Sequence, residues 1–439
     1  MFCKGSLISL SFLLINTFFS HLVGFERSDY VYTDKVYKPY LHTVKLVNDG
    51  TRNLIPVIDM QKNNRLMLTF DDLRGDFTDM EYTIIHCDID WRESDLMTND
   101  YIDGMNSDYI SEYDFSFNTF VKFTNYQLMF PNENMRPTKP GNYVLKVYAA
   151  GNKDDVFLTR RFLVVDRLIS VDGKVRQSTQ ARFRRDHHEV VFDVDYSRLS
   201  QEINPYTDIK VVVLQNYRWD MAITDLEPLY ARADLLNFGH QEGNQLPAGN
   251  EFRSFDTRSV QFKRFGIENI SFDSVYNFRV MQDVDRSRLT YTNRVDMNGQ
   301  RVIAADNSQK PHLESDYANV YFHLKYDGYL EQGEEIYVFG ALSDWQPNER
   351  FRMKYNSKKN LYEATVLLKQ GFYNYEYIIY REGDEVFDNT RTEGSFFETE
   401  NNYTVLVYYR NRYLNVYHLA GMSSFNSGLD KEQRLRLDR

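Results

Sequence analysis

Cysteine is nearly absent from this chain of 439 residues, which contains only two. Cys3 lies in an N-terminal segment that we expect to be removed, so Cys87 is the only thiol of the expected mature protein. An intrachain disulfide is therefore excluded there, and the fold has to be held by its cores. A mature length of about 415 residues suffices for two to four domains that each bury an adequate core.

Positive charge is also in short supply. The chain has 52 Lys and Arg residues against 63 Asp and Glu residues, for a net charge of −11. Nucleic acids and anionic membrane surfaces both attract a basic face. We therefore predict that neither is the main partner of this protein.

Catalytic signatures are missing as well. The sequence has no G-x-S-x-G elbow, no glycine-rich phosphate loop, no H-E-x-x-H and no Cys–His pair with local support. Among 63 carboxylates some pairs meet by chance, so acidic pairs are not specific for acid–base catalysis. We predict that the protein is not an enzyme and uses no cofactor, with an unrecognised hydrolase as the remaining enzymatic alternative.

A long apolar run occurs once, at the N-terminus. Lys4 precedes the apolar stretch of residues 7–19, which is the charge-then-apolar order of a secretory signal. The stretch is shorter than the roughly 20 residues that a membrane-spanning helix needs. No clean small-x-small triplet marks a cleavage point, so an uncleaved anchor stays open as an alternative. We expect residues 1–24 to be a signal peptide and the mature chain to have no transmembrane span.

Aromatic residues, by contrast, are abundant: 33 Tyr, 31 Phe and 3 Trp. Such residues favour strands, and from Tyr40 onward apolar and polar side chains alternate with period two. Turn-forming segments such as residues 139–141 separate the runs. Strands are predicted at residues 42–48, 54–60, 65–70, 81–87, 142–149, 156–165, 168–175, 189–195, 209–215, 251–263, 275–282, 319–326, 335–341, 361–368, 372–380, 403–409 and 413–418.

This spacing predicts an all-β protein of three immunoglobulin-like or early-set sandwiches in series. The expected boundaries are residues 25–166, 167–308 and 309–418, followed by a flexible tail at 419–439. Within the second unit, Val190, Phe192 and Val194 share one face of a strand. The apolar run of residues 211–214 predicts a central strand that is covered on both faces.

Several neighbouring residues are of types that bind metal ions, but the geometry of a strand argues against a metal site. His86 and Cys87 are adjacent, so in a strand they point to opposite faces and cannot both bind one metal ion. Asp88 and Asp90 share a face, but no glycine-spaced loop supplies the further oxygens that calcium needs. We predict no metal site and a buried Cys87. The tryptophans Trp91 and Trp219 are interpreted as core anchors.

An aromatic and acidic run at residues 101–120 is the strongest candidate for a partner-contacting loop. It carries Tyr101, Tyr109 and Tyr113 among several carboxylates, and the polar stretch of residues 95–118 that it overlaps is predicted to be a long loop or an excursion at a sheet edge rather than a helix. The alternative is a solvated loop that packs its own tyrosines.

Six stretches, taken in order, resemble one known family. They are residues 84–91, 114–119, 141–148, 215–219, 249–256 and 296–299. Together they resemble the plug protein of the type IX secretion system of Gram-negative bacteria, over nearly the whole mature chain. The resemblance implies a non-catalytic subunit on the periplasmic face of the outer membrane. There it would close the periplasmic opening of the large translocon barrel, its partner, when no substrate passes.

The third unit has a likeness of its own. Residues 336–345, 361–364 and 371–377 are similar to the glycogen-binding type of early-set sandwich, in which an aromatic pair stacks on sugar rings and a lysine donates hydrogen bonds. Trp345 and Tyr362 match the aromatic positions, whereas Glu376 stands where the lysine is expected. The alternative function is therefore an exported carbohydrate-binding protein that uses this unit.

Overall fold

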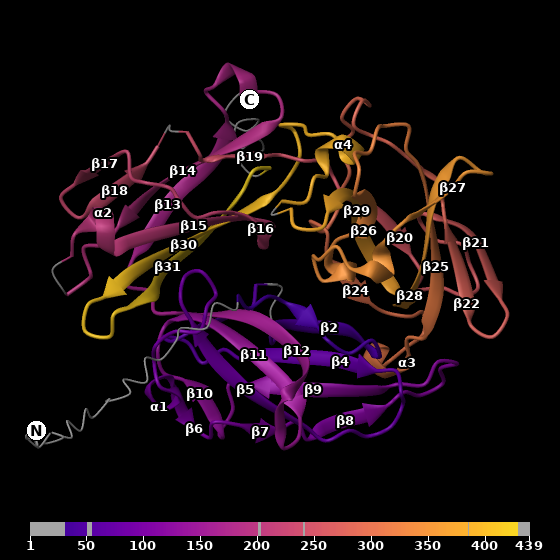
Figure 1. The fold of residues 1–439 in the computed structure, drawn as a ribbon, viewed down its shortest axis with the longest axis horizontal. Helices are drawn as coiled ribbons and strands as arrows, with labels where there is room; N and C mark the ends of the chain where they lie inside the picture. The colour runs from indigo at the N-terminus through magenta and orange to yellow at the C-terminus, as the bar shows by residue number, and fades with distance from the viewer. Residues whose placement is uncertain (1–30, 51–54, 201–202, 240–241, 385, 429–439) are drawn as a thin grey trace, which may run out of the picture.

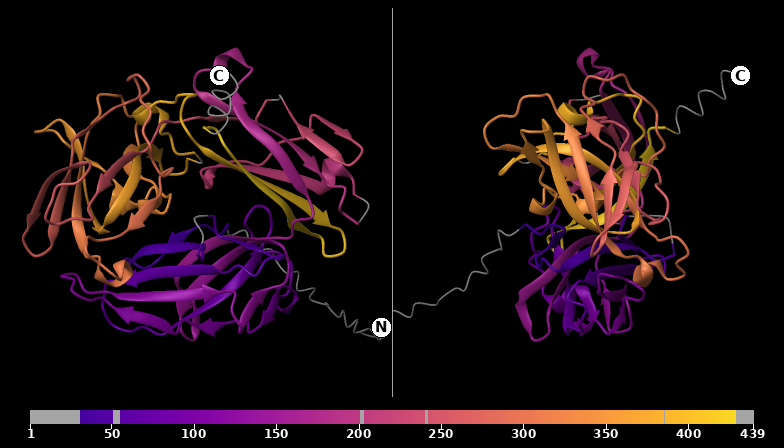
Figure 2. Two further views of the ribbon diagram at one scale, coloured as in Figure 1. Left: turned by 180° about the vertical axis from the view of Figure 1, so that it is seen from behind. Right: turned by 90° about the vertical axis from the view of Figure 1, so that its right-hand side faces the viewer.

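The computed structural model describes residues 31–50, 55–200, 203–239, 242–384 and 386–428. The expected signal peptide at residues 1–24 lies outside them. Strands dominate, which confirms the predicted all-β class, and three sandwiches meet in a triangle (Figure 1; Figure 2). The α-helices in the described ranges have four residues each, so none of them is long enough to cross a membrane.

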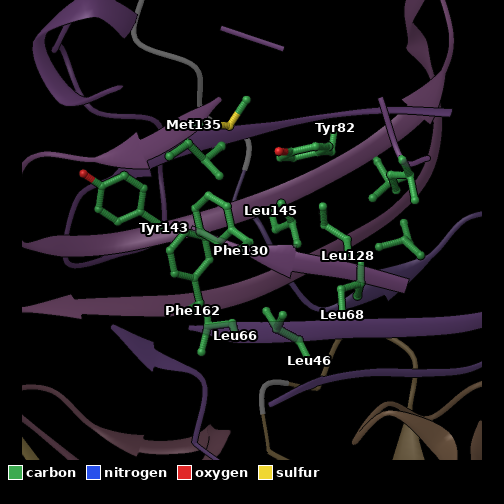
Figure 3. Packing of buried hydrophobic residues seen from close by; sticks show 14 of the residues in the cluster. Leu46, Leu66, Leu68, Tyr82, Leu128, Phe130, Met135, Tyr143, Leu145 and Phe162 are labelled. Atoms are coloured by element: carbon green, nitrogen blue, oxygen red, sulfur yellow. The ribbon is translucent and has the colours of Figure 1, made fainter. Parts of the chain in front are cut away.

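The first sandwich packs two mainly antiparallel sheets around a core of aliphatic and aromatic side chains. One sheet has the order β1 (Lys35–Val36), β12 (Asn152–Val165), β11 (Gly141–Ala149), β5 (Met80–Cys87), β7 (Asp108–Tyr109), with β3 (Val57–Asp59) parallel to β12. The other has the order β2 (Leu41–Asn48), β4 (Leu66–Asp72), β9 (Thr124–Phe130), β8 (Glu112–Phe115). Between them, Phe130 of the second sheet packs edge to face on Phe162 of the first, which stacks on Tyr143 (Figure 3).

Two short strands and a helix complete this unit. β6 (Ile102–Gly104) pairs with β10 (Met135–Pro137), and α1 (Thr98–Tyr101) leads into β6. The stretch at residues 95–118, predicted as a loop or an edge excursion, therefore contains three short strands, β6, β7 and β8, and the single helical turn of α1, which was not predicted. Two of them, β7 and β8, end the two main sheets of the sandwich.

The second sandwich is closed by the C-terminal strands of the chain. One sheet has the order β13 (Ser170–Gln177), β14 (His187–Asp195), β18 (Leu235–Phe238), β17 (Tyr230–Arg232), with β19 (Gln245–Pro247) also on β14. The other has the order β16 (Arg218–Ile223), β15 (Ile209–Gln215), β30 (Asn402–Asn411), β31 (Val416–Asn426), and α2 (Pro205–Asp208) precedes β15.

This pairing corrects two of the expected boundaries. The last two strands were expected in the third unit, yet β30 pairs with β15 in the register Ile209↔Tyr409. The expected flexible tail from residue 419 is also corrected, because residues 419–426 continue β31. Alternation marks a strand but does not identify its partner, which here lies about two hundred residues away in the sequence.

The third sandwich is inserted between β19 and β30. One sheet has the order β20 (Arg253–Asp256), β29 (Gly371–Arg381), β24 (Arg301–Ile303), with β26 (Glu334–Phe339) also on β29. The other has the order β21 (Ile267–Phe272), β22 (Tyr276–Val280), β25 (Tyr317–Lys325), β28 (Leu361–Lys369), β27 (Lys354–Asn356), with β23 (Asp283–Val284) on β25. The short helices α3 (Pro311–Glu314) and α4 (Thr390–Glu393) lie in its connections. The expected boundary at residue 308 is corrected, because strands from Arg253 onward already belong here.

Both patterns predicted for the second unit are confirmed. Val190, Phe192 and Val194 lie in its core. Val211 and Val213 lie in that core too, whereas Val212 and Leu214 face the first sandwich. The run at residues 211–214 is thus apolar throughout because both of its faces are buried.

Candidate functional site

The first and second sandwiches share an apolar interface. Ile85, Val144 and Leu163 of the first pack with Leu406 and Leu419 of the second in one buried cluster. An interface built this way excludes water as the cores do, so the two sandwiches are held as one body.

Two tryptophans meet at this interface. The rings of Trp91 and Trp219 lie edge to face with centroids 4.7 Å apart. The guanidinium of Arg161 lies 4.4 Å from the Trp91 ring centroid and is buried. Cation–π contact is stronger when the cation is desolvated. The tryptophans are therefore anchors, as predicted, but they anchor one domain to another.

The first and third sandwiches are joined by a buried ion pair. Lys369 Nζ lies 2.7 Å from Asp71 Oδ2, and Tyr317 and Asn125 also donate hydrogen bonds to this carboxylate. Burial lowers the pKa of Lys369, and the carboxylate of Asp71 offsets part of that effect. The ammonium also lies 3.9 Å from the ring centroid of Phe123. Each charge is thus compensated within the interface.

A second buried ion pair joins the second and third sandwiches. Arg218 of β16 lies 3.0 Å from Glu376 of β29 and 2.6 Å from Asp220. Asn389 donates a further hydrogen bond to Glu376. Burial raises the pKa of Glu376 to about 7, although Arg218 opposes this shift. All three sides of the triangle are therefore closed by buried contacts.

The residues that resemble a sugar site are engaged elsewhere. Glu376 is the buried partner of Arg218, whose guanidinium also lies 5.7 Å from the Trp345 ring centroid. Trp345 is half-buried and packs against Phe339.

Tyr362 lies in the other sheet of the third sandwich, on β28. Its ring packs against Tyr326 and Tyr355. Trp345 instead belongs to the cluster around β26. The structure thus places the expected aromatic pair in two separate clusters and covers the face of Trp345 with a side chain of the second sandwich.

The three tyrosines proposed as partner contacts differ in how exposed their side chains are. Tyr101 is only 4% exposed and packs against His86 and Tyr143, so it belongs to the core. Its position at the end of α1 turns it inward. Tyr109 is 59% exposed on β7, and Tyr113 is 39% exposed on β8. Two of the three are therefore available at sheet edges.

Exposed aromatic rings lie on β8, in the loop that follows it and beside them, and we name this group the aromatic ledge. Phe77 lies 4.7 Å and Phe115 lies 5.8 Å from the ring of Tyr113, measured between centroids. Further along, Phe120 lies 4.7 Å from Phe272 of the third sandwich. The ledge consists of Phe77, Tyr113, Phe115, Phe117, Phe120 and Phe272, which are all exposed.

Only part of the ledge could be found in the sequence. Tyr113, Phe115 and Phe117 lie in the run at residues 101–120 at a two-residue spacing, which marks a common face in a strand, and Phe120 follows in the same run. Phe77 and Phe272 join them only through the fold, since Phe77 lies in the loop between β4 and β5 and Phe272 lies in a different sandwich.

Metal-binding side chains do not gather in the part of the chain that the structure describes. No group of three or more His, Cys, Asp or Glu residues is placed to hold an ion there. Cys87 is buried in the interface of the first two sandwiches, whereas His86 packs against Tyr143 on the opposite face. The predicted opposite orientation of these two side chains is thus confirmed.

The fold and its interfaces define a class of protein: a body of three interlocked β-sandwiches with aromatic rings displayed at its sheet edges. Residues 41–166 match the family model of the type 9 secretion system plug protein 1st domain, which confirms the family resemblance over the first sandwich.

A solved structure extends the likeness to the whole body. The crystal structure of a hypothetical protein from Parabacteroides merdae is similar with a TM-score of 0.86 and 29% sequence identity. The similarity covers 90% of this chain and 100% of that one. No curated protein matches this chain.

Proposed function

We propose that this protein is a non-catalytic plug subunit of the type IX secretion translocon. In this role it is exported, docks on the periplasmic face of the outer membrane and closes the barrel opening when no substrate passes. The match of residues 41–166 to a plug protein domain supports the assignment to this secretion system.

The proposal that the protein closes the barrel is supported by the buried interfaces that lock the three sandwiches together. A plug has to resist deformation while it covers an opening that is wide enough for folded cargo. An apolar interface and two buried ion pairs close the three sides of the triangle. Large buried interfaces oppose relative domain motion, so the body presents one wide and stiff surface.

Conductance measurements test this proposal. The purified translocon barrel is reconstituted in planar bilayers with and without this protein. We expect the protein to lower the open-pore current at least tenfold, and heat-unfolded protein at the same concentration to leave it unchanged. A current that stays the same while the native protein remains bound to the barrel contradicts the closing role.

A further inference from the structure

We propose that the outer edge of β8 accepts an extended segment of the translocon barrel as an added strand, whose side chains pack on the aromatic ledge. This inference rests on the proposed plug function and names the surface that carries the docking. β8 lies at the rim of the first sandwich, near α3 of the third (Figure 1).

The backbone of β8 is paired on one side only. It ends its sheet, and its partner β9 is in the register Phe115↔Thr124. The N–H of Ser116 donates to the carbonyl of Phe123, so Ser116 faces β9. Antiparallel bonding alternates, and Tyr113 and Phe115 therefore direct their backbone groups outward. Among the described residues no strand pairs with that edge, and such an edge is a template for an incoming strand.

The ledge continues the core of the first sandwich out to this edge. Tyr113 lies opposite Tyr126, which is buried and stacks on Phe70 in the core. Phe115 lies on the same face two residues further and is 54% exposed. Apolar side chains of an added strand would cover these rings and complete the core face. Exposed apolar patches of this kind mark interaction sites.

Charge indicates the composition of the incoming segment. Asp76 and Asp79 are exposed on either side of Phe77 in the sequence, and Glu112 and Asp114 are exposed on β8, where they alternate with Tyr113 and Phe115 and so point to the opposite face. Within the described part of the chain, none of the four forms an ion pair. The nearby Lys122 directs its ammonium to the carbonyl of Thr119. A complementary strand therefore alternates apolar residues with Lys or Arg.

The ledge is held rigid by contacts to the third sandwich. The backbone N–H groups of Phe120 and Val121 donate to the carboxylate of Asp316, and that of Phe117 donates to the carbonyl of Leu313. The loop after β8 is thereby ordered before any partner arrives. Preorganisation of this kind reduces the entropy lost on binding.

Site-specific crosslinking identifies the occupant. A photoreactive phenylalanine analogue is placed at Phe115 in the full-length protein, in cells that contain the translocon. The control position is Tyr413, which is 93% exposed at the turn between β30 and β31. We expect a crosslink to the barrel, identified by mass spectrometry, from position 115 and none from 413. A crosslink from 115 only to a second copy of this chain, or none to the barrel, overturns the inference.

Matched substitutions separate the backbone contribution from that of the ring. Phe115→Ala removes the ring and keeps the outward N–H, whereas Phe115→Pro removes the ring and the N–H together while the bonds to β9 stay in place. We expect Phe115→Pro to lower co-purification with the barrel at least tenfold, and Phe115→Ala to lower it less. Glu112→Lys with Asp114→Lys tests the charge and is expected to weaken binding without changing the thermal midpoint.

The outcomes distinguish this inference from the plug function itself. If the wild-type protein binds the barrel and both Phe115 variants bind equally well, the β8 inference is overturned and the plug function stands. If the wild-type protein does not bind a barrel that is present and intact, the plug function fails and the inference fails with it.

Discussion

Lys369 Nζ lies 2.7 Å from Asp71 Oδ2, and the two side chains, each 1% exposed, come from different domains. The pair links β28 of the third sandwich to β4 of the first. Removal of one partner would leave an uncompensated buried charge, which is far more costly than the loss of a surface pair. The interface between these domains therefore depends on both residues together.

Asp71→Asn is expected to lower the free energy of unfolding by about 3–5 kcal/mol, because it leaves the ammonium of Lys369 buried and unpaired. Urea denaturation measures the change. In the double variant Asp71→Asn with Lys369→Met, we expect part of the loss to be recovered. The exposed pair Lys359–Glu363 is the control, and Lys359→Ala is expected to cost less than about 1 kcal/mol. Equal costs for the buried and the exposed pair contradict this prediction.

Trp91→Ala is expected to destabilise the interface of the first two sandwiches. The ring is 4% exposed and contacts Trp219 and Arg161, so its removal leaves a cavity that costs about 3–5 kcal/mol. Denaturant titration measures the loss, and limited proteolysis between Val165 and Ser170 reports loosening of the junction. Tyr413→Ala, at an exposed turn, is the control and is expected to stay within about 0.5 kcal/mol of wild type. Wild-type protease resistance of Trp91→Ala would argue against a locked junction.

Acidification is expected to destabilise the protein through three histidines. Burial lowers the pKa of His42, His86 and His418 to about 4. Between pH 6.5 and 4 the unfolded chain binds more protons at these residues than the folded chain, so stability falls as pH falls. Each histidine contributes up to about 3 kcal/mol to this loss. Thermal unfolding at pH 7 and pH 5 measures it.

Two variants check the sign of this dependence. His86→Phe is expected to reduce the loss between pH 7 and pH 5, because one proton-linked group disappears. Glu376→Gln is expected to increase it. Burial raises the pKa of Glu376 to about 7, so this carboxyl stabilises the fold as pH falls and opposes the histidines. A Glu376→Gln profile that is flatter than wild type would contradict the assignment.

Restoring the lysine of the glycogen-binding pattern is not expected to create a sugar site. Glu376→Lys places a cation beside Arg218 in a buried position, so we expect a loss of stability of several kcal/mol, on the order of 3–5. Retention on a polysaccharide column measures glycan binding for this variant, Trp345→Ala and wild type. We expect none of them to be retained. Retention of the wild type that Trp345→Ala abolishes would favour the carbohydrate-binding alternative.

The alternation of apolar and polar residues predicted much of the strand content. The run at 211–214 revealed a strand buried on both faces, because side-chain direction has a period of two and an unbroken apolar run satisfies two buried surfaces. The opposite orientation of His86 and Cys87 followed from the same rule. Of the expected contact tyrosines, Tyr109 and Tyr113 lie exposed at edges, whereas a single helical turn carries Tyr101 into the core.

The sequence did not predict which strands pair with one another when they lie far apart in the chain. β30 and β31 belong to the second sandwich and β20 is the first strand of the third. The local residue pattern of these strands does not indicate to which sandwich they belong. The role of Glu376 was equally hidden, since its partner Arg218 lies in another domain. The sequence showed that Glu376 stands where the sugar-binding lysine is expected. It did not show that Glu376 forms an ion pair with Arg218.

The amino-acid sequence by itself determined that this protein is all-β and that its cores are rich in aromatic rings. It also showed a resemblance to the plug family. Periodicity and motifs are local properties of the chain, so they can be recognised without the structure. Only the tertiary structure decided which strands share a sheet and which charges neutralise one another. It also decided which aromatic rings remain in water beside β8. Those outcomes depend on contacts between segments hundreds of residues apart, where geometry rather than composition selects the partner.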